Sequence, residues 1–227
     1  MTGLVLKLSY NNIGETPITG GICGSFFFLR PDLAVTANHV LNNANMKPNV
    51  GYNICQFWLI TQPNIIIEIK LDDLIEHPEI DTTFIKLKHN YAVPIKVISF
   101  KDIDIGQECI NEGFAGGQMP DLNASWGTTG VIISSCNYNG TIANGNGFIK
   151  SNNNMNIAAT DVKMKNVKGF ETSYGGVIGM SGGPLINKQT NEIIGIMSIG
   201  LPPDIAVKHS LFAVSINELK DKIENIT

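Results

Sequence analysis

One short stretch of the sequence, GMSGGPLIN at residues 179–187, sets a serine among glycines and a proline. Ser181 has Gly179 two positions before it and two glycines directly after it. A serine hydroxyl is a weak nucleophile until a neighbouring base removes its proton. Glycines allow the sharp backbone turn that exposes such a hydroxyl. The stretch is therefore either a plain turn or the seat of a nucleophile, and other parts of the chain must supply the base.

One candidate arrangement is the nucleophile elbow of α/β-hydrolases. The glycines around Ser181 match its G-x-S-x-G pattern, which lies between a strand and a helix, with the acid and the histidine later in the chain. Here Pro184 and a hairpin pattern follow the serine instead of a helix, and only Asp204 and His209 lie downstream with suitable side chains. The pattern therefore disfavours this class.

The order histidine, aspartate, serine fits the chain better. His39 follows an apolar strand in LAVTANHVL (33–41), and Asp81 comes directly before an apolar strand in HPEIDTTFIKLK (77–88). In such a triad His39 would be the general base, Asp81 would orient the imidazole, and Ser181 would attack. The order and spacing suit a triad assembled from loops between two β-barrels.

The elements that position these residues are mostly short β segments broken by Gly, Pro and Asn, which is typical of barrels or sandwiches. The Asn-Gly pairs at 139–140, 144–145 and 146–147 predict hairpin turns, and SNNNMN (151–156) predicts a polar surface loop. A polar seam near residues 99–108 separates two all-β halves. Predicted strands cover 26–30, 33–37, 56–60, 65–71, 83–88, 109–115, 129–136, 148–151, 157–163, 192–200 and 209–215.

The last stretch of the chain predicts a long helix. Ser215 and Glu218 form a capping box, and Ile216, Leu219 and Ile223 recur on one face.

Composition narrows the function further. Of the 227 residues, 43% are hydrophobic and 16% are charged, which supports a packed core and excludes disorder. The net charge is −4, and no Lys/Arg stripe points to nucleic acid or to an anionic membrane. The four cysteines have no CxxC spacing, so no zinc or other metal site and no cofactor is expected. The N-terminus has no signal-peptide pattern and no window is apolar enough for a membrane helix.

The motifs together resemble the chymotrypsin/trypsin-like serine proteases of the bacterial single-domain kind. The resemblance implies an all-β fold of two six-stranded antiparallel β-barrels with a C-terminal helix. Residues 1–100 would carry His39 and Asp81, and residues 101–227 would carry Ser181. It also implies a serine endopeptidase that acts on polypeptides through an acyl-enzyme. The matching segments are GSFFFLRPDLAVTANHVL (24–41), HPEIDTTFIKL (77–87), GMSGGPLI (179–186) and GIMSIG (195–200).

The resemblance also implies how a substrate is held. The backbone N–H groups of Gly179 and Ser181 would bind the oxyanion. Ser198 would support Asp81 and, with the next two residues, form the edge strand that pairs with substrate. No charge lies in the implied specificity pocket, so an uncharged residue is expected before the scissile bond (the P1 residue). The implied substrate-binding residues are Gly175 at the pocket base, Gly176, Gly200 and Ser210 in its walls, and Ser198, Ile199 and Gly200 in the edge strand.

Three positions depart from the family pattern. Asn38 stands where the family usually has alanine. Cys23 stands where a disulfide begins, but the partner position is Val40, so four free thiols and a cytoplasmic location are expected. Met180 replaces the aspartate that pairs with a newly cut N-terminus in zymogens. Activation by trimming is therefore not expected, whereas ordering by substrate or by an activating protein partner is.

Two alternative functions remain open. Asn38 and the missing activation ion pair also suit a catalytically silent or latent protease-fold module that binds or regulates. A partner-activated effector protease of a bacterial stress or defence system is the third possibility.

Overall fold

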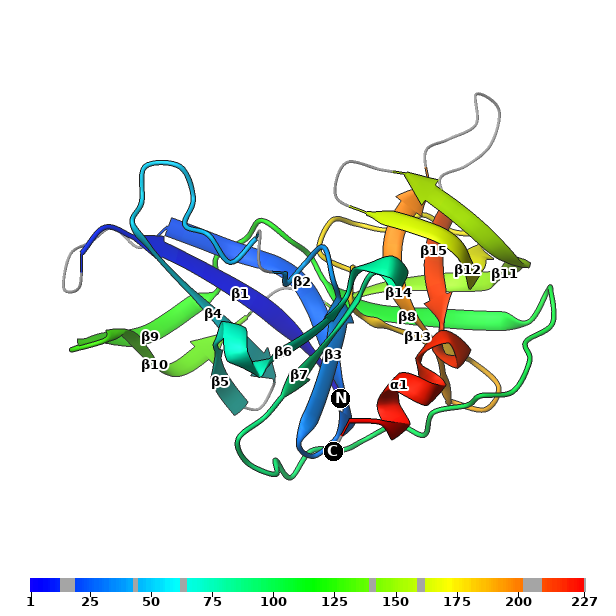
Figure 1. Cartoon of the computed structure of the whole chain (residues 1–227), viewed down its shortest axis with the longest axis horizontal. Helices are drawn as coiled ribbons and strands as arrows, with labels where there is room; N and C mark the ends of the chain where they lie inside the picture. Colours follow the sequence, from blue (N-terminus) through cyan, green and yellow to red (C-terminus); the bar gives the residue numbers. More distant parts are fainter. Residues whose placement is uncertain are drawn as a thin grey trace.

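The computed structural model describes residues 1–12, 19–42, 45–61, 65–138, 142–158, 162–201 and 210–226. Two β bodies lie side by side, one built mainly from the first half of the chain and one from the second, and residues 121–137 of the second half lie beside the first body (Figure 1). In the first body one antiparallel sheet of seven strands runs in the order β5-β4-β1-β2-β3-β7-β6. Its strands are β1 (Thr2–Tyr10), β2 (Thr19–Arg30), β3 (Leu33–Ala37), β4 (Ile54–Thr61), β5 (Ile65–Ile69), β6 (Leu74–His77) and β7 (Thr82–Lys86).

The second body is a closed barrel with the strand order β11-β12-β15-β14-β13-β8. Strands β9 (Asp121–Gly127) and β10 (Gly130–Asn137) form a separate two-stranded ribbon. The barrel strands are β8 (Glu108–Phe114), β11 (Ile142–Ala158), β12 (Lys163–Thr172), β13 (Pro184–Asn187), β14 (Ile193–Leu201) and β15 (Ser210–Ser215). The helical turns are η1 (Leu71–Asp73), η2 (Pro78–Ile80), η3 (Ile216–Leu219) and α1 (Lys220–Glu224).

The all-β fold and the six-stranded second barrel are confirmed. The first half differs from the predicted six-stranded barrel, because it is a seven-stranded sheet with β5 and β6 at its edges. The turn η1 separates these two strands, and no ladder joins them in the part of the chain that the structure describes. Strands β1, β6, β9 and, apart from Lys163, β12 were not predicted, and β1 is central because it pairs with both β2 and β4. The division into domains at residue 100 stays a prediction.

The predicted turns and loop between residues 144 and 156 were wrong, since all of them lie within β11. Residues 144–147 pair with β8. Their glycines make room for a neighbouring ring: a Cβ on Gly145 would lie 2.0 Å from Tyr174 Cε2, and one on Gly147 would lie 2.8 Å from Tyr174 Cδ1. The asparagine-rich stretch continues the strand against β12, with Asn154 and Asn156 bonded to Asn166. The pair at 139–140 lies outside the described residues, and the predicted strands 148–151 and 157–163 are not separate, because β11 runs unbroken to Ala158.

The predicted long C-terminal helix is short. Ser215 Oγ accepts from Asn217 N–H at 3.3 Å, which begins the 3₁₀ turn η3, and only Lys220–Glu224 is α-helical. The end of the chain instead docks on the first body, where Arg30 Nη1 donates to the carbonyl of Ile226 at 3.0 Å. Lys222 adds an exposed ion pair with Glu79 at 2.8 Å.

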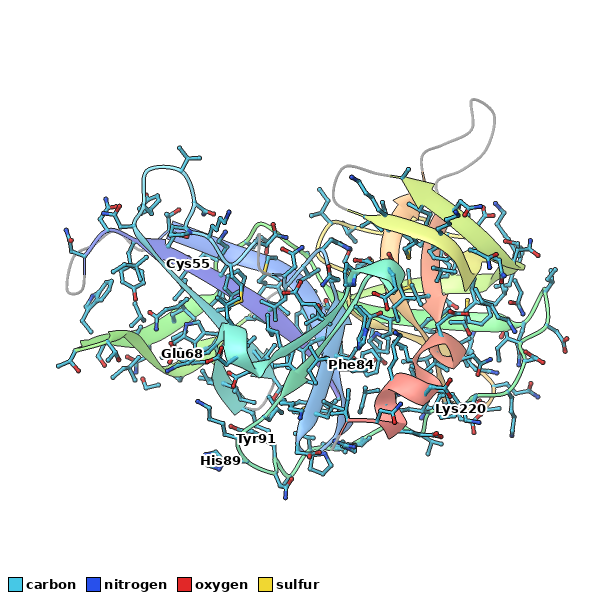
Figure 2. The ribbon with its side chains drawn as sticks, viewed as in Figure 1. Cys55, Glu68, Phe84, His89, Tyr91 and Lys220 are labelled. Carbon is cyan, nitrogen blue, oxygen red and sulfur yellow. The ribbon has the colours of Figure 1, made fainter. Side chains whose placement is uncertain are left out.

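A shared apolar core joins the two bodies. Phe27, Val35 and Phe84 from the sheet pack in one cluster with residues of the barrel such as Phe212 and Val214. Figure 2 shows Phe84 near the middle of the molecule, where sheet and barrel meet. Burying large aromatic and aliphatic side chains on both sides holds the loops after β3 and before β7 against the barrel. Within the described residues no helix is long and apolar enough to cross a membrane.

Candidate active site

His39 and Asp81 come from neighbouring strands of the sheet. β3 pairs with β7 so that Ala37 lies opposite Thr82, which brings the turn after β3 onto the residue just before β7. Asp81 has left-handed backbone angles, φ 47° and ψ 47°, a conformation that aspartate adopts more readily than most residues. The backbone N–H of Asn38 donates to the Asp81 carbonyl at 3.0 Å, and this bond fixes the two turns together.

The Asp81 carboxylate is buried, with 2% of its side chain exposed, and it is hydrogen-bonded by three groups. Its Oδ2 lies 2.9 Å from His39 Nδ1, and its Oδ1 accepts from the His39 backbone N–H at 2.9 Å. From the barrel, Ser198 Oγ donates to Oδ2 at 2.5 Å. A buried charge is tolerated when it is hydrogen-bonded in this way. These contacts orient the imidazole and engage its Nδ1, while Nε2 has no contact with the carboxylate.

Asn38, the departure from the family pattern, has a structural role. Its Nδ2 donates to Thr83 Oγ1 at 2.9 Å and to Glu76 Oε2 at 3.3 Å, so its side chain points into β6 and β7. The polar residue beside His39 therefore braces the sheet under the histidine.

The turn that carries Ser181 is shaped by glycines. Gly179 has φ +98° and Gly182 has φ +85°, angles that favour glycine. Space is also restricted: a Cβ on Gly179 would lie 2.2 Å from Gly116 N, and one on Gly182 would lie 2.1 Å from Thr36 Oγ1. The glycines therefore form a tightly packed turn. The same turn places Ser181 at the cavity described below, so the stretch is a turn and can also carry a nucleophile.

All four carbonyls of residues 178–181 have a hydrogen-bond donor. Gly116 N–H donates to the carbonyl of residue 178 at 2.7 Å, and Gly183 N–H donates to that of residue 180 at 3.0 Å. Ser25 supplies the other two, its Oγ at 2.7 Å from the carbonyl of residue 179 and its N–H at 2.8 Å from that of residue 181. The peptide planes of this loop are therefore fixed one by one.

Two donors in the same loop are left free. Among the described residues, neither the N–H of Gly179 nor that of Ser181 has a protein partner. In a trans peptide the N–H points opposite to the preceding carbonyl, and those carbonyls are held by Gly116 and Gly183. Both N–H groups therefore point away from these anchors, and both residues line the cavity described next. Fixed, unpaired N–H groups of this kind are suited to bind an oxyanion.

The side chain of Ser181 is not bonded to His39 in this conformation. Its Oγ donates to the carbonyl of Ser198 at 2.9 Å, and no hydrogen bond joins it to the imidazole. Ser198 lies at a β-bulge between Met197 and Ile199, where β14 shifts its register against β15. The bulge takes the Ser198 carbonyl out of the regular ladder and leaves it open to the serine.

His39 and Ser181 line one cavity of about 460 Å³. Four predicted substrate-binding residues also line it, namely Gly176, Ser198, Ile199 and Gly200. Gly175 and Ser210 are not among its lining residues, and their predicted role stays a prediction. The remaining lining residues are almost all apolar: Cys23, Val162, Val177, Ile178, Gly179, Met180, Met197 and Leu211.

Sequence reasoning missed Leu211 and Ser25. Leu211 lies opposite Gly200 in the β14–β15 ladder, and a Cβ on Gly176 would meet its Cδ2 at 2.7 Å, so it fills the space between two predicted pocket walls. The sequence predicts its neighbour Ser210 as a wall residue, and successive side chains of a strand point to opposite faces. Ser25 is the second residue of the matching segment 24–41, but its partner in the serine loop, Gly179, lies 154 residues away in the sequence.

Charge and metal chemistry around the site are simple. Burial raises the pKa of the Cys23 thiol to about 12, so this cavity-lining thiol is protonated at neutral pH. All four cysteines are unpaired, as the sequence predicted. In the described part of the chain no cluster of three or more His, Cys, Asp or Glu side chains is placed to hold a metal ion.

Fold and site define the chain as a trypsin-like serine peptidase in architecture. The profile of the trypsin-like peptidase domain matches residues 24–196, which cover the segments with His39, Asp81 and Ser181, and the chain belongs to this family. A comparison with curated proteins found no match.

Solved structures of similar fold include bacterial proteases. The active form of the Rv3671c protease from M. tuberculosis is 16% identical with a TM-score of 0.61, over 99% of this chain and 80% of that one. The serine endoprotease from Yersinia pestis is 16% identical with a TM-score of 0.58, over 97% of this chain and 61% of that one. An AlgW variant, an HtrA-type protease with a decapeptide, is 14% identical with a TM-score of 0.63, over 100% of this chain and 64% of that one. At these identities the likeness establishes the fold.

Proposed function

We propose that the chain is a serine endopeptidase that hydrolyses peptide bonds through His39, Asp81 and Ser181. The observation that carries the proposal is one cavity that holds three things: an imidazole bonded to a buried carboxylate, a serine hydroxyl, and two fixed N–H groups that have no partner among the described residues. This set supplies a base, a nucleophile and an oxyanion site, which acyl transfer requires.

The first step needs a small movement of the serine. Ser181 Oγ leaves the Ser198 carbonyl by rotation about χ1 and donates to His39 Nε2. The imidazole takes the proton as Oγ attacks the substrate carbonyl, and Asp81 stabilises the imidazolium. The oxyanion accepts from the N–H groups of Gly179 and Ser181. His39 then donates the proton to the leaving amine, and an acyl-enzyme forms on Ser181.

Water completes the cycle. His39 removes a proton from a water molecule that attacks the acyl ester, and the second tetrahedral intermediate uses the same two N–H groups. Collapse of this intermediate returns the proton to Ser181 Oγ and releases the new carboxylate.

Substrate binding follows from the cavity. A peptide in extended form would pair with residues 198–200 of β14, and its P1 side chain would enter the apolar space bounded by Met180, Met197 and Leu211. An isolated cation in that space would lack a partner, so the proposed P1 residue is uncharged. An HtrA-type neighbour was solved with a decapeptide, which agrees with a polypeptide ligand here.

The test is labelling with a fluorophosphonate followed by intact-mass analysis and peptide mapping. We expect one adduct, located on Ser181 and lost in Ser181→Ala. A folded wild-type protein that forms no adduct would overturn the proposal of a competent enzyme.

A second candidate, a latent or partner-activated protease, has its own support. The hydroxyl of Ser181 bonds to Ser198 rather than to His39, so the nucleophile lies in a resting position. Labelling that appears only after a peptide substrate or a candidate activating protein is added would favour this latent form. Against dependence on a cut N-terminus, Met180 Sδ accepts from Val177 N–H at 3.2 Å and so orders the loop without an ion pair.

A cytoplasmic location is also proposed. It is supported by the four unpaired cysteines, because disulfides form and persist in oxidising compartments.

A further inference from the structure

A buried serine of the first body contacts the loop that carries the candidate nucleophile. Ser25 lies in β2 with none of its surface exposed. Its Oγ donates to the Gly179 carbonyl at 2.7 Å and accepts from the Phe114 N–H at 2.9 Å. Its backbone N–H donates to the Ser181 carbonyl at 2.8 Å. One residue therefore holds the carbonyl between the two proposed oxyanion donors and the carbonyl that follows the second donor.

The Ser25 hydroxyl, and not the Ser25 backbone, holds the Gly179 carbonyl. The peptide plane between residues 179 and 180 includes the Gly179 carbonyl, and among the described residues Ser25 Oγ is the one donor to that carbonyl. The Gly179 N–H lies in the preceding peptide plane, whose carbonyl is held by Gly116, and the φ of Gly179, +98°, sets the angle between the two planes. Because glycine has no side chain to restrict it, the orientation depends on the hydrogen bonds that hold those planes.

In a variant without the Ser25 hydroxyl, a water molecule has no room to take its place on the side of Gly113. A Cβ on Gly113 would lie 3.0 Å from Ser25 Oγ and 2.9 Å from Met180 Cα, so the protein is closely packed there. Gly179 and Phe114 are both buried. Removal of the hydroxyl would leave the buried Gly179 carbonyl and the buried Phe114 N–H without this partner. Because an unpaired buried polar group is costly, the peptide planes would rotate so that these groups form other hydrogen bonds.

We propose that the Ser25 hydroxyl is a positioning group of the oxyanion site, which fixes, through the Gly179 carbonyl, the peptide plane that joins the Gly179 and Ser181 donors, and so couples the first body to the loop of the second. The inference rests on the proposed function, because it assigns a role in that same reaction. Ser25 does not touch the substrate. Its effect is expected in the rate of the chemical step and not in the protonation of His39.

The experiment measures the rate of fluorophosphonate labelling at Ser181 as a function of pH, with the melting temperature of each variant. In Ser25→Ala we expect the plateau rate to fall roughly 10–100-fold, less than or equal to the loss of a whole oxyanion donor. The pH midpoint should stay at the wild-type value, because the His39–Asp81 pair is untouched. Ser9→Ala is the matched control, since Ser9 is also a fully buried serine of the sheet whose hydroxyl accepts one backbone N–H, from Asn49.

Ser25→Cys keeps a donor at this position, larger and weaker than the hydroxyl, and covers the case in which Ser25→Ala fails to fold. Its plateau rate should fall several-fold with the midpoint unchanged. A plateau equal to that of Ser9→Ala in whichever of these variants folds would overturn the role of Ser25 while leaving the proposed function intact. Absence of labelling in the wild type would overturn the proposed function and this inference with it. A shifted pH midpoint would also overturn it, because it would show that the imidazole had been disturbed.

Discussion

At the scale of single residues, the candidate site depends on donors from both bodies. The Asp81 carboxylate accepts from His39 on its own sheet and from Ser198 on the barrel. The loop of Ser181 is anchored by Ser25 from the sheet. Neither half alone completes the geometry, which explains why the chemistry sits where the two meet.

The first prediction tests the nucleophile and the base. Ser181→Ala and His39→Ala should each remove fluorophosphonate labelling and peptidase activity. Triad members act as a unit, so the two losses should be similar. The melting temperature of Ser181→Ala should stay nearly unchanged, because its hydroxyl makes a single bond to one carbonyl. A variant that keeps more than a small fraction of wild-type turnover would contradict the assignment.

The second prediction concerns Asp81→Asn. The amide keeps the shape of the side chain but offers His39 Nδ1 a donor on one side, which favours the wrong tautomer and leaves Nε2 protonated. By analogy with characterised Ser-His-Asp proteases, turnover should fall by roughly 10⁴-fold. Substrate KM should change little, and steady-state kinetics on a cleaved peptide would separate the two effects. A drop confined to KM would show that Asp81 shapes binding instead.

The sequence predicts those site residues that lie next to a recognisable strand. His39 after a strand and Asp81 before one could be selected because each lies at a strand end. The structure places His39 at the cavity that Ser181 lines, and Asp81 bonds to His39. Ser25 could not be selected in the same way. A serine in a strand has no local mark of its role, and only the packing of the two bodies brings it to the Gly179 carbonyl.

At the scale of elements, the turn of residues 179–183 before β13 is packed so tightly that adding a single methyl group should disturb it. Gly179 combines φ +98° with a Cβ position 2.2 Å from Gly116 N. Gly51 has a similar φ of +89°, but a Cβ there would meet nothing within 4 Å. The pair therefore separates backbone strain from crowding.

The third prediction is that Gly179→Ala abolishes labelling and lowers the melting temperature, while Gly51→Ala keeps full labelling. Gly51→Ala should cost only the strain of a positive φ, about 1 kcal/mol in the free energy of unfolding. Thermal unfolding and labelling of both variants make the comparison. Equal behaviour of the two variants would mean that the loop relaxes freely and does not fix the Gly179 N–H.

The fourth prediction concerns the strand pair that bounds the proposed P1 space. Leu211 lies opposite Gly200, and its Cδ2 would be 3.9 Å from a Cβ on Gly200 and 2.7 Å from one on Gly176. Leu211→Ala should open this space and shift cleavage toward larger apolar P1 residues by roughly 10-fold or more in relative kcat/KM. Leu211→Val is the milder version if the alanine variant is too unstable. A peptide library with varied P1 residues reads out the shift, and an unchanged profile would place the P1 side chain elsewhere.

The elements themselves were predicted unevenly, for physical reasons. Apolar alternation located β3 and β7 well, because both are buried strands with strong β formers. The Asn-Gly pairs of β11 predict turns, because glycine is favoured where a turn requires a positive φ. Glycine is also required where another group approaches the backbone closely, and in β11 the ring of Tyr174 does so. The C-terminal segment was predicted as a long helix from its capping pattern, whereas tertiary contacts of Ile226 and Arg30 draw the chain away after α1.

At the scale of the whole molecule, the two bodies share one apolar core, and the cysteines are distributed across both. Cys23 and Cys55 lie in the sheet, Cys109 and Cys136 in the second half. The fifth prediction is that a thiol reagent finds four reactive groups per chain in denatured, unreduced protein. In the native protein Cys109 and Cys136 should react slowly, because both are buried. A count of zero after denaturation would mean two disulfides and would remove the support for a cytoplasmic location.

The same burial predicts a loss of stability at alkaline pH. Burial raises the pKa of Cys109 and of Cys136 from the ordinary value of 9.0 to about 11. Below pH 9 both thiols are protonated in the folded and unfolded states, so their contribution to stability is fully present. Between pH 9 and 11 the unfolded chain releases these protons while the folded chain keeps them, and the free energy of unfolding falls. The melting temperature should therefore decrease over this window, by roughly 2–4 °C for each kcal/mol lost.

A Cys109→Ala, Cys136→Ala double variant separates the thiols from the lysines and tyrosines that titrate in the same range. Its melting temperature should start lower but decline less steeply from pH 9 to 11, and a slope equal to that of the wild type would show that the two thiols do not carry the effect.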